Sequence, residues 1–353
     1  MSYVLLPVTY LFLLVASVRR WWLLRQSSPL PVPVVVIGNI SVGGTGKTPI
    51  VIALAQALTK KGIAVGIISR GYGSRHSNSP QSITSSSSVE KSGDEALLIA
   101  QATQCPVVID RNRVAAVHHL LACHPSIQLV LSDDGLQHYR LPRVMELVVI
   151  DGKRGMGNGW CLPSGPLREP IKRLKSVQWV FSNGQLDNTE LKDQLDSIQE
   201  SSAGFKNGII EMEPYKWRNV VSGELCELSP LPWKNIVDNN RGEGKSDGKG
   251  EGSEKSRSNK LLAVAAIGNP QRFFDTLDSL GIKTNTGKQI KTMAFDDHHE
   301  FTEADFMLGS KPIVLMTSKD AVKCRQFAKP NWWALEVITE LPDAFIDDVA
   351  ALV

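Results

Sequence analysis

The sequence between residues 38 and 48 reads Gly38-Asn39-Ile40-Ser41-Val42-Gly43-Gly44-Thr45-Gly46-Lys47-Thr48. It follows an apolar, β-branched segment (34–37) that predicts a strand, and it precedes a segment (49–60) that predicts a helix. Glycines let backbone N–H groups turn toward phosphate oxygens, and the start of the following helix adds a favourable dipole. The stretch therefore predicts a phosphate-binding loop, although the strict pattern G-x-x-x-x-G-K-[ST] has glycine where this chain has Ser41.

This loop predicts a nucleoside triphosphate as ligand, together with Mg²⁺, but by itself it does not distinguish an ATPase, a GTPase and a small-molecule kinase. Lys47 would reach the β- and γ-phosphates, and the hydroxyl of Thr48 would bind the metal. The alternative is a tight turn that happens to precede a lysine. The residues predicted to contact the nucleotide are Ser41, Val42, Gly43, Gly44, Thr45, Gly46, Lys47 and Thr48.

The rest of the chain alternates short apolar runs with helical patterns. Strands are expected at 64–69, 107–109, 129–131 and 147–150, and a helix at 113–122. Apolar strands between amphipathic helices indicate a parallel sheet that is covered on both faces. Further along the chain, strands are expected at 261–266, 313–317 and 332–337, and helices at 272–280, 303–308 and 319–327. The fold class is therefore α/β, with a parallel-sheet core that carries the P-loop and a second, smaller α/β domain; the family resemblance described below implies that this core is P-loop kinase-like.

Two segments interrupt this rhythm. Residues 74–92 are rich in serine and predict a flexible excursion, and residues 239–259 lack large apolar side chains and predict a disordered insertion. We expect an N-terminal anchor at 1–28, the P-loop domain at 29–220 and the smaller domain at 221–353.

Composition excludes several classes of protein. The chain has 353 residues, of which 42% are hydrophobic and 21% are charged, so disorder throughout and a multi-span membrane protein are ruled out. A net charge of +3 gives no case for nucleic-acid binding. The five cysteines include no C-x-x-C pair, which argues against a disulfide framework or structural zinc and fits a reducing compartment.

The first eighteen residues carry no charged side chain, and Arg19, Arg20, Trp21 and Trp22 follow them. The apolar run is short for a full membrane span, and its charges come after it, unlike those of a secretory signal. We expect an uncleaved membrane-anchoring helix that dips into or lies on the bilayer, with its arginines on the cytoplasmic side. A buried N-terminal core helix is the alternative.

Acidic residues and histidines supply the candidate chemistry. Asp133 and Asp134 end a predicted strand, at the edge of the sheet where ligands bind, and either could hold Mg²⁺. Asp94 opens a helix, where acids often serve only to complement the helix dipole. His298 and His299 are adjacent, which makes a poor metal site, so a general base or an orienting partner is more plausible.

Several motifs together resemble one family, tetraacyldisaccharide 4'-kinase (the lipid A 4'-kinase). They are Gly43-Gly44-Thr45-Gly46-Lys47-Thr48-Pro49, Ser69-Arg70-Gly71-Tyr72-Gly73, Gly93-Asp94-Glu95, Asp133-Asp134-Gly135-Leu136-Gln137-His138, Leu162-Pro163-Ser164-Gly165-Pro166-Leu167-Arg168-Glu169-Pro170, Gly268-Asn269-Pro270-Gln271-Arg272-Phe273-Phe274 and Asp297-His298-His299. The resemblance covers nearly the whole chain. Ser318 departs from it, because the family usually has glutamate there, and the 239–259 insertion looks longer than usual.

The resemblance implies transfer of the γ-phosphate of ATP to the 4'-hydroxyl of a tetraacylated glucosamine disaccharide 1-phosphate, which yields lipid IVA in lipid A biosynthesis. It also implies a location at the cytoplasmic face of the bacterial inner membrane. The expected partners are the lipid A disaccharide precursor and the membrane surface, with no nucleic acid, and the chain is expected to act as a monomer.

The resemblance also assigns roles to residues. Lys47 and Arg168 would neutralise phosphate charge, while Asp94 paired with His298 would deprotonate or orient the sugar hydroxyl, with His299 as the other candidate. Metal ligands are expected among Thr48, Asp133, Asp134 and Glu169, and contacts to the acceptor among Arg70, Tyr72, Glu95 and His299. The competing hypotheses are a membrane-associated P-loop ATPase switch, which leaves the second domain unexplained, and a catalytically inactive scaffold.

Overall fold

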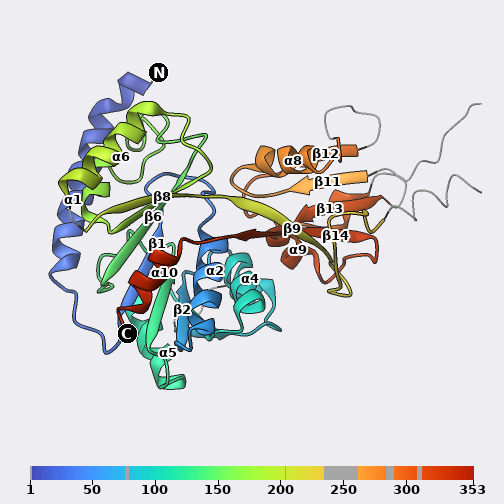
Figure 1. Ribbon diagram of the computed structural model, residues 1–353, viewed down its shortest axis with the longest axis horizontal. Helices are drawn as coiled ribbons and strands as arrows, with labels where there is room; N and C mark the ends of the chain where they lie inside the picture. The colour runs from blue at the N-terminus through green and yellow to red at the C-terminus, as the bar shows by residue number, and fades with distance from the viewer. Residues whose placement is uncertain (1, 76–78, 203, 234–260, 284–289, 308–311) are drawn as a thin grey trace, which may run out of the picture. The chain divides into compact units, whose positions relative to one another are not determined.

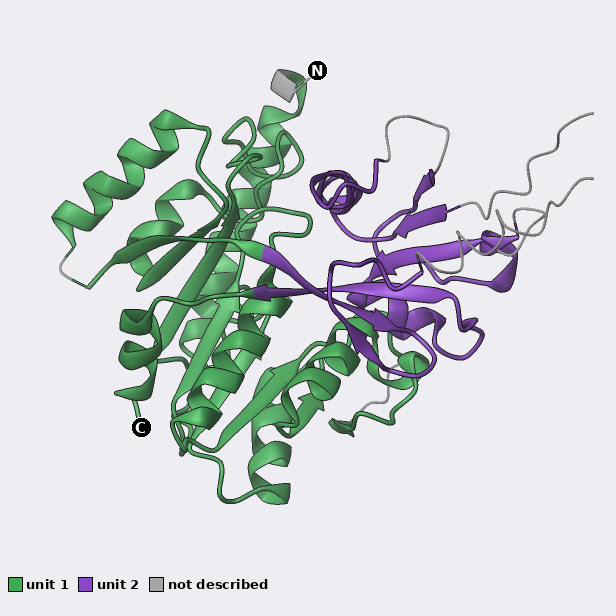
Figure 2. Cartoon of the chain, turned by 45° about the vertical axis from the view of Figure 1, so that its right-hand side comes forward, with its two compact units in different colours: residues 1–212, 339–353 green, residues 213–338 purple. Residues whose placement is uncertain are grey.

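The computed structural model describes residues 2–75, 79–202, 204–233, 261–283, 290–307 and 312–353 (Figure 1). The chain divides into two compact units (Figure 2). The first unit consists of Met1–Met212 and Thr339–Val353, and the second is Glu213–Ile338. The sequence prediction differs at both ends of the second unit, because it starts the smaller domain at residue 221 and assigns it the whole C-terminus.

The first unit is built on an eight-stranded sheet with the order β3-β4-β2-β5-β1-β6-β7-β8. Every neighbouring pair is parallel except β3 with β4. The strands are β1 (Val34–Gly38), β2 (Val65–Ser69), β3 (Gln81–Ile83), β4 (Val107–Ile109), β5 (Leu129–Asp133), β6 (Met145–Asp151), β7 (Trp179–Asn183) and β8 (Lys206–Ile210). Because β1 lies between β5 and β6, the loops after these strands gather at one edge of the sheet, where α/β proteins bind their ligands.

Helices cover both faces of this sheet, as the apolar strands predict. Alternate residues of β1 point into different cores: Val35 and Ile37 into one, Val34 and Val36 into the other. The first core takes side chains from α2 (Lys47–Lys60), α4 (Asp94–Thr103) and α10 (Asp343–Ala350). The second takes them from α5 (Arg113–Cys123) and α6 (Thr189–Ser201).

The C-terminal segment returns to the first unit because α10 completes its core. Phe345 is fully buried, and its ring lies 5.2 Å from that of Trp179 and 5.0 Å from that of Phe181. Sequence patterns missed this helix, as well as β7 and β8.

The N-terminal helix α1 (Leu6–Leu24) follows a short 3₁₀ turn, η1 (Ser2–Leu5), and exposes most of its apolar side chains. Thr9 and Leu23 are its only buried residues, so the alternative of a buried core helix is wrong. Within the described residues, no helix has both the length and the apolar character needed to cross a bilayer.

The second unit contains a six-stranded sheet with the order β10-β9-β14-β13-β11-β12. The strands are β9 (Met212–Asn219), β10 (Leu225–Cys226), β11 (Leu261–Ala265), β12 (Ile290–Ala294), β13 (Ile313–Thr317) and β14 (Trp332–Thr339). Its helical elements are α8 (Pro270–Ser279), α9 (Ser318–Cys324) and the 3₁₀ turn η3 (Glu303–Phe306). Tryptophans fill one of its cores, where the rings of Trp217 and Trp233 lie 4.8 Å apart.

Two further predictions differ from the structure. The serine-rich segment 74–92 contains ordered elements, since β3 pairs with β4 and the short helix α3 (Val89–Ser92) precedes α4. The helix expected at 303–308 is only the 3₁₀ turn η3, and residue 308 lies outside the described residues. The insertion expected at 239–259 also lies outside them.

Candidate active site

The loop between β1 and α2 is shaped by glycines at two positions. Gly43 and Gly46 have φ angles of 99° and 93°, a backbone region that residues with a Cβ rarely adopt, and a Cβ at Gly46 would collide with the side chain of Met212. Helix α2 then begins at Lys47, and no described side chain caps its first turn. The N–H groups of that turn are therefore open to an anionic ligand, as a phosphate-binding loop requires.

Side chains from neighbouring strands hold this loop in place. Asn183, at the end of β7, donates a 3.0 Å hydrogen bond to the carbonyl of Thr45, and Arg154, just after β6, donates one of 2.8 Å to the carbonyl of Val42. The N–H of Val42 donates to the carbonyl of Pro166 at 2.8 Å. The prediction that Val42 contacts the nucleotide is therefore not supported for its N–H group. Sequence reasoning missed Asn183 and Arg154, although polar residues at the carboxyl ends of parallel strands were a usable signal.

Two cations converge on Asp134, which follows β5. The Nζ atom of Lys47 lies 3.5 Å from one carboxylate oxygen, and Nη1 of Arg168 lies 3.4 Å from the other. Burial alone would raise the pKa of Asp134, but the charges of Lys47, Arg168 and Arg113 outweigh it and lower the pKa below its ordinary value. Asp134 is therefore ionised and holds two phosphate-binding candidates beside the loop.

Asp133 lies in a different environment from its neighbour. It is 1% exposed, and neither of its carboxylate oxygens accepts a hydrogen bond from a described residue. Burial, followed by the nearby negative charges of Glu95 and Asp134, raises the pKa of Asp133 to about 7. A buried carboxylate without a hydrogen-bond donor is stabilised by a proton or by a nearby cation, so Asp133 is a candidate ligand for a cation. Among the described residues, no group of three or more histidine, cysteine, aspartate or glutamate side chains forms a complete metal site.

Asp94 begins helix α4 and is 4% exposed. One of its carboxylate oxygens accepts a 2.9 Å hydrogen bond from the N–H of Glu95, which fixes the orientation of the carboxylate. The preceding Gly93 has a φ of 76° and allows the backbone of Tyr72 to approach so closely that a Cβ would collide with its carbonyl. The loop after β2, which bears the half-exposed Tyr72, thus lies next to the start of α4.

A buried arginine and a histidine complete this edge of the sheet. Arg113 is 2% exposed, and its Nη2 atom donates a 2.8 Å hydrogen bond to the backbone carbonyl of Asp133. Burial and the positive charges of Arg113 and Arg70 lower the pKa of His138 to about 3, so this imidazole is neutral. Neither Arg113 nor His138 was assigned a role from the sequence, although His138 belongs to a quoted motif.

The carboxylate of Glu169, which we expect from the sequence to be a metal ligand, is engaged by donors of the protein itself. One carboxylate oxygen accepts a 2.7 Å hydrogen bond from Gln137, and the other accepts bonds from the Tyr139 hydroxyl at 2.6 Å and from Nε of Arg173 at 3.1 Å. Because protein donors engage both oxygens, the geometry argues against a magnesium role for Glu169. It indicates a residue that braces the segment carrying Arg168.

The two adjacent histidines of the second unit, His298 and His299, have different surroundings. His298 has a φ of 64°, and its Nε2 atom lies 3.8 Å from the carboxylate of Asp297, which also pairs with Lys319 at 3.1 Å. His299 stacks on Phe295, with ring centres 4.4 Å apart, and its Nε2 atom lies 3.5 Å from Asp305. His299 is thus part of the packing, whereas His298 adopts a strained backbone conformation of the kind that functional residues often have. Its pairing with Asp94, in the other unit, stays a prediction.

Comparison with known proteins shows the family to which the chain belongs. The family model described as tetraacyldisaccharide-1-P 4'-kinase (LpxK) matches residues 1–353. The chain belongs to the tetraacyldisaccharide-1-P 4'-kinase family. It is 40% identical over 346 residues to the tetraacyldisaccharide 4'-kinase of Legionella pneumophila (strain Lens), covering 98% of this chain and 91% of that protein. It is 39% identical over 353 residues to the enzyme of the same name from Nitrosococcus oceani, covering 99% and 90%.

A solved structure in this kinase family has the same fold. The crystal structure of LpxK from Aquifex aeolicus in complex with ATP superposes with a TM-score of 0.70 at 25% sequence identity, covering 99% of this chain and 98% of that one. In the present chain, the kinase motifs of the first unit gather at the carboxyl edge of its sheet: Lys47, Asp134 and Arg168 in direct contact, with Asp133 and Glu95 beside them. Ser41 is buried and bridges to Leu167, so it shapes the loop rather than its open surface. Gly44 and Thr48 remain accessible.

Proposed function

We propose that this chain transfers the γ-phosphoryl group of ATP to the 4'-hydroxyl of tetraacyldisaccharide 1-phosphate, which forms lipid IVA and ADP. Membership of the family supports the reaction. One structural observation carries the assignment to a site: Lys47 and Arg168 converge on Asp134 beside a glycine-shaped loop and an uncapped helix N-terminus. These groups suit phosphoryl transfer, which needs mainly positioning and charge neutralisation.

The nucleotide would bind with its phosphates against the N–H groups at the start of α2. Lys47 would move from Asp134 to the β- and γ-phosphates, because a 3.5 Å ion pair with partly exposed partners is weak and easily exchanged. Arg168, whose side chain is one-third exposed, would neutralise the charge on the transferred phosphoryl group. The open N–H groups would come from the first turn of α2, whereas Val42 would contribute none.

The residues present fit a magnesium ion. The two unpartnered oxygens of Asp133, the ionised Asp134 and the hydroxyl of Thr48 form an oxygen-rich set at the end of β5 and the start of α2. When bound, Mg²⁺ neutralises phosphate charge and orients the terminal phosphates. Asp133 is the best candidate for direct contact, because burial has left its carboxylate without any described donor.

Asp94 would accept or orient the proton of the acceptor hydroxyl, with His298 as its partner. The hydrogen bond from the N–H of Glu95 holds the Asp94 carboxylate at the helix start, where the dipole favours the charged form. As the hydroxyl oxygen bonds to phosphorus, its proton passes to this pair and the bond to ADP breaks. Arg70, Tyr72 and Glu95 would flank the acceptor, and His299 would support His298 by packing.

The acceptor is amphiphilic, so we place the reaction at the cytoplasmic face of the inner membrane with α1 as the attachment. The helix exposes a continuous apolar surface that includes Leu11, Leu14, Val15, Trp21 and Trp22, of which the two tryptophans are each 55% exposed. Tryptophans beside arginines are typical of a membrane interface. Deletion of residues 1–25 should lower vesicle binding and raise the apparent KM for lipid more than the KM for ATP.

The test is a γ-³²P-ATP assay with tetraacyldisaccharide 1-phosphate as acceptor, with the 4'-phosphorylated lipid as the expected product. A membrane-associated ATPase switch would instead hydrolyse ATP at the same rate with and without acceptor. Light scattering of the detergent-solubilised chain should give one copy per particle, because we expect a monomer to carry all of the required residues.

A further inference from the structure

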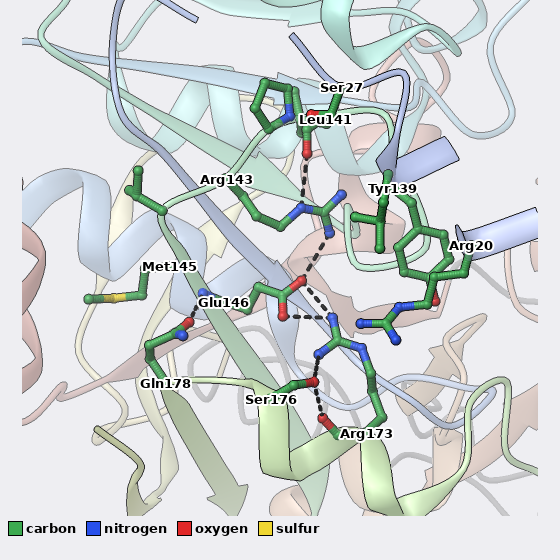
Figure 3. A pocket seen from close by; sticks show the side chains of 13 residues that line it. Arg20, Ser27, Tyr139, Leu141, Arg143, Met145, Glu146, Arg173, Ser176 and Gln178 are labelled. Carbon is green, nitrogen blue, oxygen red and sulfur yellow. Dashed lines mark hydrogen bonds and ion pairs between the residues drawn. The ribbon is translucent and has the colours of Figure 1, made fainter. Parts of the chain in front are cut away.

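A cavity of about 410 Å³ lies in the first unit between the C-terminal end of α1 and the start of β6 (Figure 3). Its volume is within the range of small-molecule sites, roughly 300–1,000 Å³. The cavity lies near the amino end of β6, whereas the phosphate-binding loop lies at the carboxyl edge of the sheet. Three guanidinium groups, from Arg20, Arg143 and Arg173, line it together with Glu146 (Figure 3).

Two of these arginines are neutralised by the protein itself. Arg173 binds both oxygens of Glu146 at 2.6 Å and one oxygen of Glu169 at 3.1 Å. Arg143 binds Glu146 at 3.1 Å and several backbone carbonyls. Two carboxylates thus balance two guanidinium groups, and Arg20 is left over.

Arg20 is a cation without an anion in the described part of the chain. No hydrogen bond or ion pair of its guanidinium is found there, and its Nε atom is buried without a partner. Its guanidinium carbon lies 5.4 Å from the ring centre of Tyr139, whose hydroxyl donates to Glu169 and so cannot serve as the anion. Because a partly buried, unpaired charge is costly, the cavity should attract an anion.

The position of Arg20 on α1 indicates where that anion comes from. Thr9 and Leu23 are buried and Leu13 packs on the second core of the first unit, so the face that these residues share with Arg20 is turned toward the protein. Leu24 lines the cavity and is 47% exposed, and the neighbouring Trp21 and Trp22 are exposed as well. If those tryptophans lie at the interface, the phosphates of the lipid head groups lie at the same depth as the cavity.

We propose that this cavity binds the phosphate of an anionic phospholipid head group, with Arg20 as its principal contact. The proposal rests on the membrane attachment proposed above for α1. Head-group binding would fix the rotation of α1 about its axis and the depth of the first unit at the bilayer. Ser27 and Gln178, which also line the cavity, offer further donors to a phosphate or to the glycerol beside it.

The chain offers a matched control, because Arg19 is exposed and does not line the cavity. Arg20→Gln and Arg19→Gln remove the same charge from adjacent positions of one helix. We would measure binding of the full-length chain to vesicles of phosphatidylcholine alone and with added phosphatidylglycerol. If the attraction to the anionic surface is only diffuse, removal of one cation near that surface lowers the vesicle affinity by about fivefold. Arg20→Gln should lower the phosphatidylglycerol preference by at least about tenfold, since it also removes charge-assisted hydrogen bonds.

Ser27→Phe provides a second variant that keeps every charge and fills the cavity. It should lower the phosphatidylglycerol preference while leaving binding to pure phosphatidylcholine intact. Equal losses from Arg19→Gln and Arg20→Gln, with no effect of Ser27→Phe, would overturn the proposal in favour of diffuse electrostatics. Failure of the unaltered chain to bind either vesicle would instead overturn the membrane attachment.

Two further measurements distinguish a phospholipid head group from free phosphate and from the phosphate of the acceptor. Inorganic phosphate at matched ionic strength should not abolish the phosphatidylglycerol preference. If it does so for the unaltered chain, a free-anion site replaces the lipid site. Kinetics in neutral detergent micelles should show the same KM for the tetraacyldisaccharide in Arg20→Gln as in the unaltered chain. A raised KM there would assign the cavity to the acceptor and overturn the proposal.

Discussion

The hydroxyl of Thr9 on helix α1 donates a 2.7 Å hydrogen bond to Oγ of Ser164, and the backbone N–H of Ser164 donates one of 3.2 Å back to Thr9. Both residues are buried. Ser164 lies four residues before Arg168, which contacts Asp134 at the candidate active site. This reciprocal pair therefore joins the exposed apolar helix to the segment that carries a candidate phosphate-binding arginine.

We expect Thr9→Val to weaken this attachment, because valine keeps the shape of threonine but removes both hydrogen bonds. The unsatisfied groups of Ser164 should cost about 1–3 kcal/mol of unfolding free energy. Urea denaturation of the full chain measures this loss, and the kcat for lipid phosphorylation should fall with it. Ser17→Ala, at an exposed position of the same helix, is the control and should change neither quantity. An unchanged free energy of unfolding in Thr9→Val would show that the hydrogen bonds between Thr9 and Ser164 do not contribute to the attachment of α1.

Asp133 should make the metal-free protein less stable as pH rises. Its folded pKa, about 7, lies above the ordinary value of 3.8, so between these values the folded state binds a proton that the unfolded state has lost. The contribution of Asp133 to stability is therefore lost as pH rises through this window. Asp133→Asn should remove the dependence and raise the Tm in EDTA at pH 7 to 8, while it lowers kinase activity.

In EDTA we expect Asp133→Asn to have a higher Tm than the unaltered chain, and added Mg²⁺ and ATP should reverse this difference. They should raise the Tm of the unaltered chain more than that of Asp133→Asn, because only the former has the negative charge that the cation would neutralise. Thermal scans at pH 5, 6, 7 and 8 with and without MgATP provide the comparison. A Tm difference between the two proteins that is constant with pH in EDTA would contradict the assignment.

Asp94→Asn should lower kcat by roughly 10²–10⁴-fold while leaving ATP affinity nearly unchanged, because general base catalysis contributes effects of that size. His298→Ala should lower kcat in a similar way. His299→Ala is the informative contrast, because this ring packs on Phe295 and Phe301. Its loss should lower the free energy of unfolding while changing kcat little. Turnover by Asp94→Asn at the normal rate would remove this residue from the mechanism.

Glu169→Gln distinguishes a bracing role from a metal-binding role. The change weakens a buried ion pair with Arg173, and breaking such pairs costs about 3–5 kcal/mol. We expect a marked loss of stability and a lower kcat with an unchanged Mg²⁺ concentration for half-maximal activity. Asp133→Asn, measured alongside, should shift that concentration upward. A comparable upward shift in Glu169→Gln would restore the original prediction that Glu169 is a metal ligand.

Local sequence patterns were sufficient for the parts of this chain that are continuous in sequence. The glycines at 43 and 46, the lysine after them and the flanking apolar strand predicted the phosphate-binding loop, because turn geometry and helix starts depend on neighbouring residues. The α/β class followed from the fully apolar strands, and β4 and α5 were placed to within a residue. The family motifs named Lys47, Asp134 and Arg168, which the fold brings together.

Only the tertiary structure decided which of several similar side chains does what. Asp133 and Asp134 are adjacent and chemically identical, yet burial beside Glu95 raises the pKa of one and three cations lower that of the other. Glu169 was expected to bind a metal, but Gln137, Tyr139 and Arg173 reach it from other segments. The return of α10 to the first core and the unpaired Arg20 likewise depend on residues far away in the chain. Charge state, ion pairing and core packing are set by distances between side chains, and folding creates those distances between residues that the sequence keeps apart.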